Sequence, residues 1–544
     1  MINRRELLKS SLVSFGGAVV SGALGSSRAR AIFADDATSA GPIVKTTLGR
    51  LRGAYANGVY SFKGIHYGAS TEGAMRFQPP SPPKPWTGVR DALEFGPPAP
   101  QDILVGGLAK FIGDLVGPGG MSEDCLVLNV WTPSLHRPAK RPVMVWLHGG
   151  GFAMGSSGVA LYDGTNLAAK HDVVVVGVNH RLNAFGYLFL GEVGGEKYAD
   201  SGNAGMLDIV LALRWVHDNI AQFGGNPANV TIFGESGGGG KVSTLMAMPP
   251  AKGLFHKAIV ESYSALRMSS RHEADQAARK FLEQLHVTQS RVDDLLTIPV
   301  SQIIAAVHAT PNRFLYFTPV VDGRSLPRHP FDPDAPALTA DVPMLIGTNK
   351  DEERLFALDD PGLFSLNEED MRAKLRAFLQ LTDQSKLDGV IAAYRKARPN
   401  ASPSDIYFAV TTDRVFRMDA ITQAERKAAQ HAAPAYMYLF AWPTPVLAGK
   451  LKAAHAMEIP FVFDNIDRVP GLIGNAPELQ PLADKVSHAW AAFARNGNPK
   501  HAGLPYWPAY DSKMRATMIL NNECKVVNDP GKDERLAISS LLKA

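Results

Sequence analysis

The sequence predicts an α/β fold in which a mostly parallel central sheet is covered by helices on both faces. Continuous apolar runs at 143–147 and 173–178 are typical of strands that are buried on both sides. Residues 204–222 carry apolar side chains at helical spacing, and a strand-like run at 230–233 follows them. Strands that alternate with helices in this way form parallel sheets.

The remaining elements complete this pattern along the chain. Short strand-like runs occur at 43–47 and 51–53, and a stretch rich in Pro and Gly at 78–120 predicts a surface loop. Further strands are expected at 125–131, 344–347 and 436–440, and further helices at 237–247 and 477–496. The charged, helix-rich segments 266–310 and 360–430 are interpreted as insertions that cap the sheet. No linker divides residues 32–544, which are expected to form one domain.

Composition excludes several classes of protein. The chain has 544 residues, of which 45% are hydrophobic and 20% charged, as in a folded globular protein. Two cysteines cannot make a disulfide-rich scaffold or a zinc ribbon, and no cluster of metal ligands accompanies His455 and Glu458, so no metal or organic cofactor is expected. The net charge of +4 resides entirely in residues 1–31, which hold five basic residues and one acidic residue. The neutral remainder predicts no attraction to nucleic acid.

Residues 1–31 are typical of an export signal. Arg4 and Arg5 form a basic pair, a mildly apolar stretch rich in Gly and Ala spans 10–25, and Ala29-Arg30-Ala31 is an A-x-A cleavage site. The segment is too short and too rich in glycine for a stable membrane anchor. The paired arginines resemble a twin-arginine signal, which predicts a periplasmic or secreted protein.

A candidate nucleophile lies in Gly234-Glu235-Ser236-Gly237-Gly238, which fits G-x-S-x-G. The motif follows a predicted strand and precedes a helix that starts with small residues. Such a sharp turn strains the serine backbone and exposes Oγ, and the flanking glycines let the chain pass close to itself. These features favour a nucleophilic serine over an ordinary glycine loop.

A second motif, His148-Gly149-Gly150-Gly151-Phe152, follows the apolar strand at 143–147. Residues without side chains allow backbone amides to face a substrate carbonyl, as in the oxyanion loops of lipases and esterases. A phosphate loop would instead continue with Gly-Lys-Ser/Thr, which is absent here.

A serine nucleophile requires a histidine base and an orienting carboxylate. Four histidines follow the segment in which the acid is expected, namely His431, His455, His488 and His501. His455 is favoured because it lies in a loop of small residues before an apolar segment. Asp351 and Glu352 both follow the strand at 344–347, and the residues alone do not distinguish them as the acid.

The order of the motifs makes the chain similar to the type-B carboxylesterases, the family of α/β-hydrolases that contains the cholinesterases. The resemblance extends from about residue 43 to 535 and rests on the two motifs above together with segments 62–67, 76–80, 122–126, 223–227, 318–323, 349–352, 455–463 and 497–499. It implies an α/β-hydrolase fold with helical insertions over the active site, and hydrolysis of small carboxylic esters.

The resemblance also implies roles for individual residues. The expected triad is Ser236 as nucleophile, Glu352 as acid and His455 as base. The expected oxyanion donors are the amides of Gly150, Gly151 and Gly237. Side chains expected to support the histidine are those of Glu235, Ser262 and Glu458.

The chain departs from the family pattern at several positions. Gly237 replaces the usual alanine after the nucleophile, although its amide is retained. Ala99 replaces a cysteine that would pair with Cys125, so Cys125 and Cys524 are both expected to be free thiols. Segment 117–121 lacks the tryptophan with which cholinesterases bind a cation, which argues against choline esters.

The family places the acyl pocket just before 318–323, which in this chain brings in Arg313, Phe314 and Phe317. A guanidinium matches a carboxylate, so Arg313 in the pocket would select esters that carry a free carboxylate. The alternatives to a general esterase are thus a narrow hydrolase of carboxylate-bearing esters, carbamates or lactones, and a non-catalytic binding protein. The presence of all three triad residues argues against the last of these.

Overall fold

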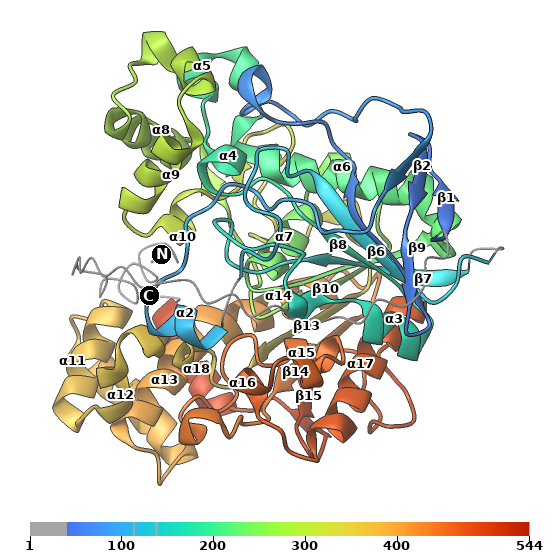
Figure 1. Ribbon diagram of the computed structural model, residues 1–544. Helices are drawn as coiled ribbons and strands as arrows, with labels where there is room; N and C mark the ends of the chain where they lie inside the picture. Colours follow the sequence, from blue (N-terminus) through green and yellow to red (C-terminus); the bar gives the residue numbers. More distant parts are fainter. Residues whose placement is uncertain (1–40, 113–114, 137–139, 543–544) are drawn as a thin grey trace, which may run out of the picture.

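A large twisted sheet forms the centre of the computed structural model, which describes residues 41–112, 115–136 and 140–542 (Figure 1). Its eleven strands lie in the order β16-β15-β14-β13-β10-β9-β7-β8-β6-β4-β3. Strands from β8 to β15 pair in parallel, and the pairs at both ends of the sheet are antiparallel. The predicted α/β architecture is therefore confirmed.

The inner strands coincide with the apolar runs of the sequence. They are β7 (Arg141–Leu147), β8 (Val174–Val178), β9 (Gly225–Glu235), β10 (Lys257–Glu261), β13 (Met344–Asn349) and β14 (Ala435–Phe440). The outer strands are β3 (Ala54–Ala56), β4 (Val59–His66), β6 (Val127–Thr132), β15 (Ala516–Leu520) and β16 (Lys525–Asn528). A separate small sheet contains β1 (Ile43–Lys45), β2 (Arg50–Arg52) and β5 (Val89–Asp91).

Both faces of the sheet are covered because successive side chains of a strand point to opposite sides. Along β7, Val143 and Val145 join a core with α6 (Ala204–Asn219), α7 (Gly237–Leu245) and α14 (Met418–Ala428). Met144 and Trp146 join the opposite core, which includes α3 (Thr165–His171) and α17 (Leu479–Asn496). These two layers are visible on either side of the sheet in Figure 1.

Two helical insertions rise from one edge of the sheet. The first contains α8 (Arg271–Gln284), α9 (Val300–Ala309) and α10 (Arg313–Tyr316), and the second contains α11 (Glu368–Leu379), α12 (Gln384–Ala397) and α13 (Pro403–Thr412). The second has its own apolar core, to which Ile538 of α18 (Lys532–Leu542) contributes. Figure 1 shows the two insertions as separate groups of helices, with α2 (Gly107–Ile112) between them.

The helix α2 differs from the prediction, because 78–120 was expected to be loop. Leu104, Leu108, Phe111 and Leu115 recur at helical spacing in this stretch, a signal that the surrounding glycines and prolines obscured. The helix contacts α16 (Pro470–Ile473) and the short turn at Phe356–Asp359. The loop is therefore held against two other segments of the chain.

The two cysteines are buried free thiols, which confirms that prediction. Cys125 precedes β6 within the core, and burial raises the pKa of its thiol well above the ordinary value. Cys524 follows β15 and donates a hydrogen bond to the carbonyl of Asn521.

Three histidines pack together beside α17, and this arrangement predicts sensitivity of the fold to acid. The rings of His488 and His501 stack with their centroids 4.1 Å apart, and the ring of His171 lies 5.4 Å from that of His488. Burial and the neighbouring His488 lower the pKa of His171 to about 4, and burial also lowers the pKa values of the other two. Because the unfolded chain binds these protons more readily, stability should fall as pH drops from about 6.5 towards 4.

We expect His171→Gln, which can still hydrogen-bond to Ser487, to flatten the loss of stability between pH 7 and pH 5 by about 1 kcal/mol. Thermal unfolding measured across this pH range tests the expectation. His286→Gln, at an exposed position after α8, serves as the control and should leave the slope unchanged. An equal slope in wild type and His171→Gln would contradict the expectation.

Candidate active site

Ser236 occupies a strained turn between β9 and α7. Its backbone has φ 54° and ψ −124°, values that a residue with a side chain adopts only when its surroundings enforce them. The Ser236 amide donates a hydrogen bond to the carbonyl of Glu261 on the neighbouring strand at 2.9 Å. A Cβ atom on Gly238 would lie 1.9 Å from the carbonyl oxygen of Leu147, so the turn requires glycine there. The result is a serine at the carboxyl edge of the sheet that faces a cavity.

His455 approaches this serine from a loop that follows β14. Its Nδ1 donates a hydrogen bond to Glu352 Oε2 at 2.6 Å, and both side chains are buried. Glu352 lies three residues beyond β13, and its Oε1 accepts a bond of 2.7 Å from the amide of Asn349. The carboxylate is thus held from both sides and fixes the orientation of the imidazole.

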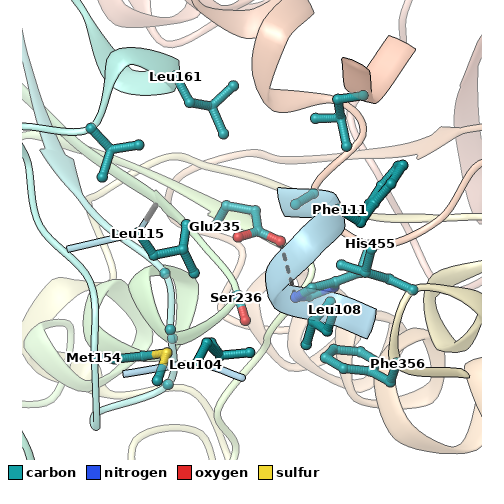
Figure 2. A pocket seen from close by; sticks show the side chains of 18 of the residues that line it. Leu104, Leu108, Phe111, Leu115, Met154, Leu161, Glu235, Ser236, Phe356 and His455 are labelled. Carbon is teal, nitrogen blue, oxygen red and sulfur yellow. Dashed lines mark ion pairs between the residues drawn. The ribbon is translucent and has the colours of Figure 1, made fainter. Parts of the chain in front are cut away.

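The other ring nitrogen of His455, Nε2, lies 3.1 Å from Glu235 Oε1 (Figure 2). The rings of Phe356 and Phe416 flank the imidazole, each with its centroid 5.1 Å away. Figure 2 shows the hydroxyl of Ser236 near this pair, on the wall of the same cavity. Nε2 therefore lies beside the carboxyl group of Glu235, and His455 and Ser236 line the same cavity.

Further buried carboxyls lie behind the histidine. Glu458 accepts hydrogen bonds from the hydroxyl of Ser262 at 3.3 Å and from the side-chain amide of Asn349. Glu261, which sequence reasoning did not single out, accepts a bond from the indole of Trp490 at 3.0 Å. Whether a buried acid supports an active site depends on its partners in space, which the sequence does not show. The sequence therefore offered no signal for Glu261.

Burial and mutual repulsion set the ionisation of this cluster. Burial raises the pKa of Glu235 to about 8 against the opposing effect of His455, and burial with the charge of Glu352 raises the pKa of Glu458 to about 7. Burial alone would lower the pKa of His455, but the carboxylates of Glu235 and Glu352 raise it to about 9. The charges of Glu235 and Glu352 thus favour the protonated form of the imidazole.

The glycine loop after β7 forms the opposite wall of the cavity. Gly150 and Gly151 have φ values of 81° and 64°, which glycine adopts without strain. A Cβ atom on Gly237 would lie 1.9 Å from the carbonyl oxygen of Gly151, so the loop lies directly against the start of α7. The alanine usual in the family at this position would require the loop to shift.

The cavity in front of Ser236 has a volume of about 970 Å³. Its walls are mainly apolar and, as Figure 2 shows, include side chains from α2 and its flanks, from the segment after the glycine loop and from the turn at Phe356–Asp359: Leu104, Leu108, Phe111, Leu115, Met154, Leu161 and Phe356. Sequence reasoning missed the four residues around α2. In the described part of the lining, the basic groups Arg468 and Lys374 each lie beside an acid, Asp163 at 3.2 Å and Asp360 at 3.9 Å.

Of the residues predicted for the acyl pocket, Phe317 is the one whose side chain is described. Phe317 is buried against the ring of Phe281, with centroids 5.1 Å apart, and it is Leu315 that lines the cavity. Arg313 and Phe314 belong to α10, but their side chains lie outside the described residues.

The other candidates for the base and the acid lie elsewhere. His488 and His501 belong to the cluster beside α17, and His431 follows α14. Asp351 Oδ2 accepts a bond of 3.4 Å from the amide of Ala453, while its neighbour Glu352 holds the imidazole. Only one of the four histidines is thus joined to an acid at the serine.

The described residues contain neither a metal-ligand cluster nor a helix that could span a membrane. Across 41–112, 115–136 and 140–542, no group of three or more His, Cys, Asp and Glu side chains is arranged to hold a metal ion. Within the same ranges no helix has the length and apolarity needed to cross a membrane. The predicted export signal at 1–31 lies outside the described residues.

The sheet order, the turn at Ser236 and the position of the histidine loop define the class of α/β-hydrolases. Residues 40–539 match the Carboxylesterase family. The para-nitrobenzyl esterase of Bacillus subtilis (strain 168) is 38% identical over 504 residues, which cover 91% of this chain and 97% of the relative.

Two solved structures are also similar. One is a carboxylesterase of Geobacillus stearothermophilus, with a TM-score of 0.80, 40% identity and coverage of 91% of this chain and 99% of the other. The second is an esterase of Clostridium hathewayi described as able to hydrolyse aliphatic aromatic polyesters, with a TM-score of 0.76, 35% identity and coverage of 92% and 98%. The chain belongs to the carboxylesterase family and is a carboxylic ester hydrolase.

Proposed function

We propose that the protein hydrolyses carboxylic esters through an acyl-enzyme formed on Ser236, with His455 as the base and Glu352 as the orienting acid. The observation that carries this proposal is the 2.6 Å bond from His455 Nδ1 to a fully buried carboxylate, made beside a strained serine in one cavity. A histidine held in this way has a defined tautomer and leaves Nε2 available for the serine proton.

In the acylation step, Ser236 Oγ attacks the ester carbonyl carbon while its proton moves to Nε2 of His455. The negative charge on the carbonyl oxygen is stabilised by the amides of Gly150, Gly151 and Gly237. The imidazolium then protonates the departing alkoxide, which leaves as the alcohol. Water attacks the acyl-enzyme by the same route, and the carboxylic acid is released.

Glu235 affects the first of these steps because it lies beside Nε2 in the resting enzyme. The negative charge of Glu235, 3.1 Å from Nε2, stabilises a protonated His455, and a charged imidazole cannot accept the serine proton. Productive attack requires that this proton be lost and that Nε2 face Ser236 Oγ. We infer that the activity rises with pH as His455 is deprotonated.

We expect Glu235→Gln to lower the pKa of His455 and to move the acidic limb of the kcat/KM profile down by about one pH unit. The limb moves to lower pH because the carboxylate of Glu235 raises the pKa of His455, and His455 must be neutral to act as the base. Initial rates on a neutral ester between pH 5 and pH 10 measure the limb. A limb that stays in place or moves up would show that Glu235 does not control this ionisation.

The substrates that fit the cavity best are neutral esters with bulky apolar groups on either side of the ester bond. Apolar side chains supply most of the wall, and burial of apolar substrate surface contributes roughly 25 cal/mol per Å². The polyester activity named for the Clostridium relative agrees with a wide apolar cavity. Acids outnumber bases in the described lining, and the two bases are paired, so a carboxylate-bearing acyl group finds no support there.

The experiment compares kcat/KM for a neutral aryl ester with that for its analogue carrying a free carboxylate on the acyl group. We expect the neutral ester to be preferred by about tenfold or more, since an unpaired carboxylate would lose hydration without gaining a partner. The same comparison in Arg313→Ala tests the carboxylate-selective alternative. Preference for the charged ester, lost in Arg313→Ala, would establish that alternative instead.

The amino-terminal motif supports a second proposal, that the enzyme is exported through a twin-arginine route. Residues 1–31 combine the arginine pair with an A-x-A site. Replacement of Arg4 and Arg5 by lysine in the full chain should retain the enzyme in the cytoplasm of a bacterial host. Unchanged appearance of activity in the periplasm or medium would contradict it.

A further inference from the structure

Lys241 lies on α7, five residues after Ser236, and its side chain is fully buried. A lysine rarely occupies such a position, because taking its charge out of water is costly and an apolar side chain would fill the same space at no such cost. Burial lowers its pKa to about 7. The mechanism above assigns no role to Lys241, so a buried lysine at this position beneath the active site needs another explanation.

The ammonium group contacts both ends of the glycine loop. Its Nζ donates a hydrogen bond of 2.8 Å to the carbonyl of His148, the residue that precedes the three glycines. Nζ also lies 5.6 Å from the ring centroid of Phe152, the residue that follows them, within reach of a cation–π interaction. One side chain thus contacts both residues that flank the glycine segment containing Gly150 and Gly151.

The loop has few side chains of its own to fix its geometry. His148 Nδ1 must carry a proton, because it bonds to the carbonyl of Gly149 at 2.9 Å and a carbonyl only accepts. This bond orients the peptide whose N–H belongs to Gly150. Burial and the charge of Lys241 lower the pKa of His148, so the imidazole stays neutral and keeps that tautomer.

The titratable groups that face Lys241 come from three strands. They are Glu235 at the end of β9, His148 after β7 and His180 after β8, whose ring stacks on that of His148 with centroids 4.9 Å apart. The two imidazoles are neutral, and Glu235 is the acid that favours a charged Lys241. The lysine is therefore placed to act on the loop and on its supporting histidine together.

We propose that Lys241 is a positioning residue of the oxyanion loop, which it holds through the His148 carbonyl and the Phe152 ring so that the Gly150 and Gly151 amides converge on the substrate oxygen. This inference rests on the proposed function, in which those amides stabilise the negative charge of the transition state. Without the lysine the loop retains its glycines but loses the contact that joins its two ends.

The test replaces Lys241 by methionine, which fills a similar volume without a donor, and by glutamine, which retains an N–H₂ donor on a side chain that is one bond shorter. We expect Lys241→Met to lower kcat by about 10- to 100-fold, because small displacements of transition-state donors have effects of this size. We expect Lys241→Gln to recover part of that loss, because a donor remains near the His148 carbonyl. A purely structural lysine would show no such recovery, and its loss would appear in the melting temperature.

A second measurement separates transition-state binding from substrate binding. An aryl boronic acid forms a tetrahedral adduct with a serine nucleophile, whereas a non-hydrolysable ether of the substrate has no carbonyl to place in the oxyanion hole. In Lys241→Met the inhibition constant of the boronic acid should rise in parallel with the loss of kcat, and that of the ether should stay within about twofold.

Lys427→Met provides a matched control. Lys427 is a fully buried lysine of α14 that also donates to backbone carbonyls, those of Thr339 and Ala340, and it does not line the cavity. The Lys427→Met variant should retain wild-type kcat. Unchanged kcat in Lys241→Met, an equal loss for ether and boronic acid, or failure of both Lys241 variants to fold would overturn the proposal. Retained activity in Ser236→Ala, measured alongside, would instead reject the proposed function itself.

Discussion

Ser236→Ala is expected to reduce ester hydrolysis by roughly 10³-fold or more while leaving the fold intact, because the oxyanion donors and substrate binding alone contribute only a small residual catalysis. The backbone at this position is held by the bond from its amide to Glu261 and by the glycines around it, none of which involve Oγ. Steady-state rates on a neutral ester measure the loss, and a melting curve checks the fold.

Ser243→Ala is the control for this variant. Ser243 is a buried serine of the same helix whose hydroxyl donates to the carbonyl of Gly239 at 2.9 Å, and it does not line the cavity. It should retain most of the activity. If Ser236→Ala kept more than a tenth of wild-type turnover, the nucleophile would have to be another residue.

Replacing each of the two neighbouring acids by its amide should have very unequal effects on kcat. Glu352→Gln is expected to lower kcat by about 10²- to 10⁴-fold, because an amide in place of the carboxylate cannot stabilise the imidazolium and disturbs the tautomer. Asp351→Asn should lower it by less than about tenfold, since that side chain bonds to the loop backbone at Ala453 and lies 3.6 Å from Arg354. The measurement is kcat at a pH where His455 is neutral in the wild type. The reverse ranking would assign the orienting role to Asp351.

The sequence predicted those parts of the site that depend on local geometry. The turn at Ser236 follows from glycines placed after an apolar strand, and the glycine loop after β7 follows from the same kind of reasoning. The choice between Asp351 and Glu352 could not be made from the residues, because consecutive side chains in a helical turn point in different directions and only the three-dimensional position of His455 selects one.

Other features depend on contacts between distant segments. The apolar spacing of Leu104, Leu108, Phe111 and Leu115 was present in the sequence, but its role as a cavity wall depends on the approach of α16 and of the turn at Phe356–Asp359. In the sequence Lys241 is typical of an exposed lysine, and its burial results from the packing of α7 beneath the glycine loop that follows β7. Phe317 was expected to line the acyl pocket, and its aromatic side chain fits the core equally well.

The division between sheet and insertions has a consequence for how such an enzyme can change. Ser236, Glu352 and the glycine loop are attached to the ends of β9, β13 and β7, whose register is fixed by hydrogen bonds across the sheet. The wall of the cavity is built largely from α2 and from an insertion with a separate apolar core. Substitutions in these outer segments can therefore reshape the range of accepted esters without disturbing the reacting groups, which makes them the favourable positions for directed evolution of new substrate preferences.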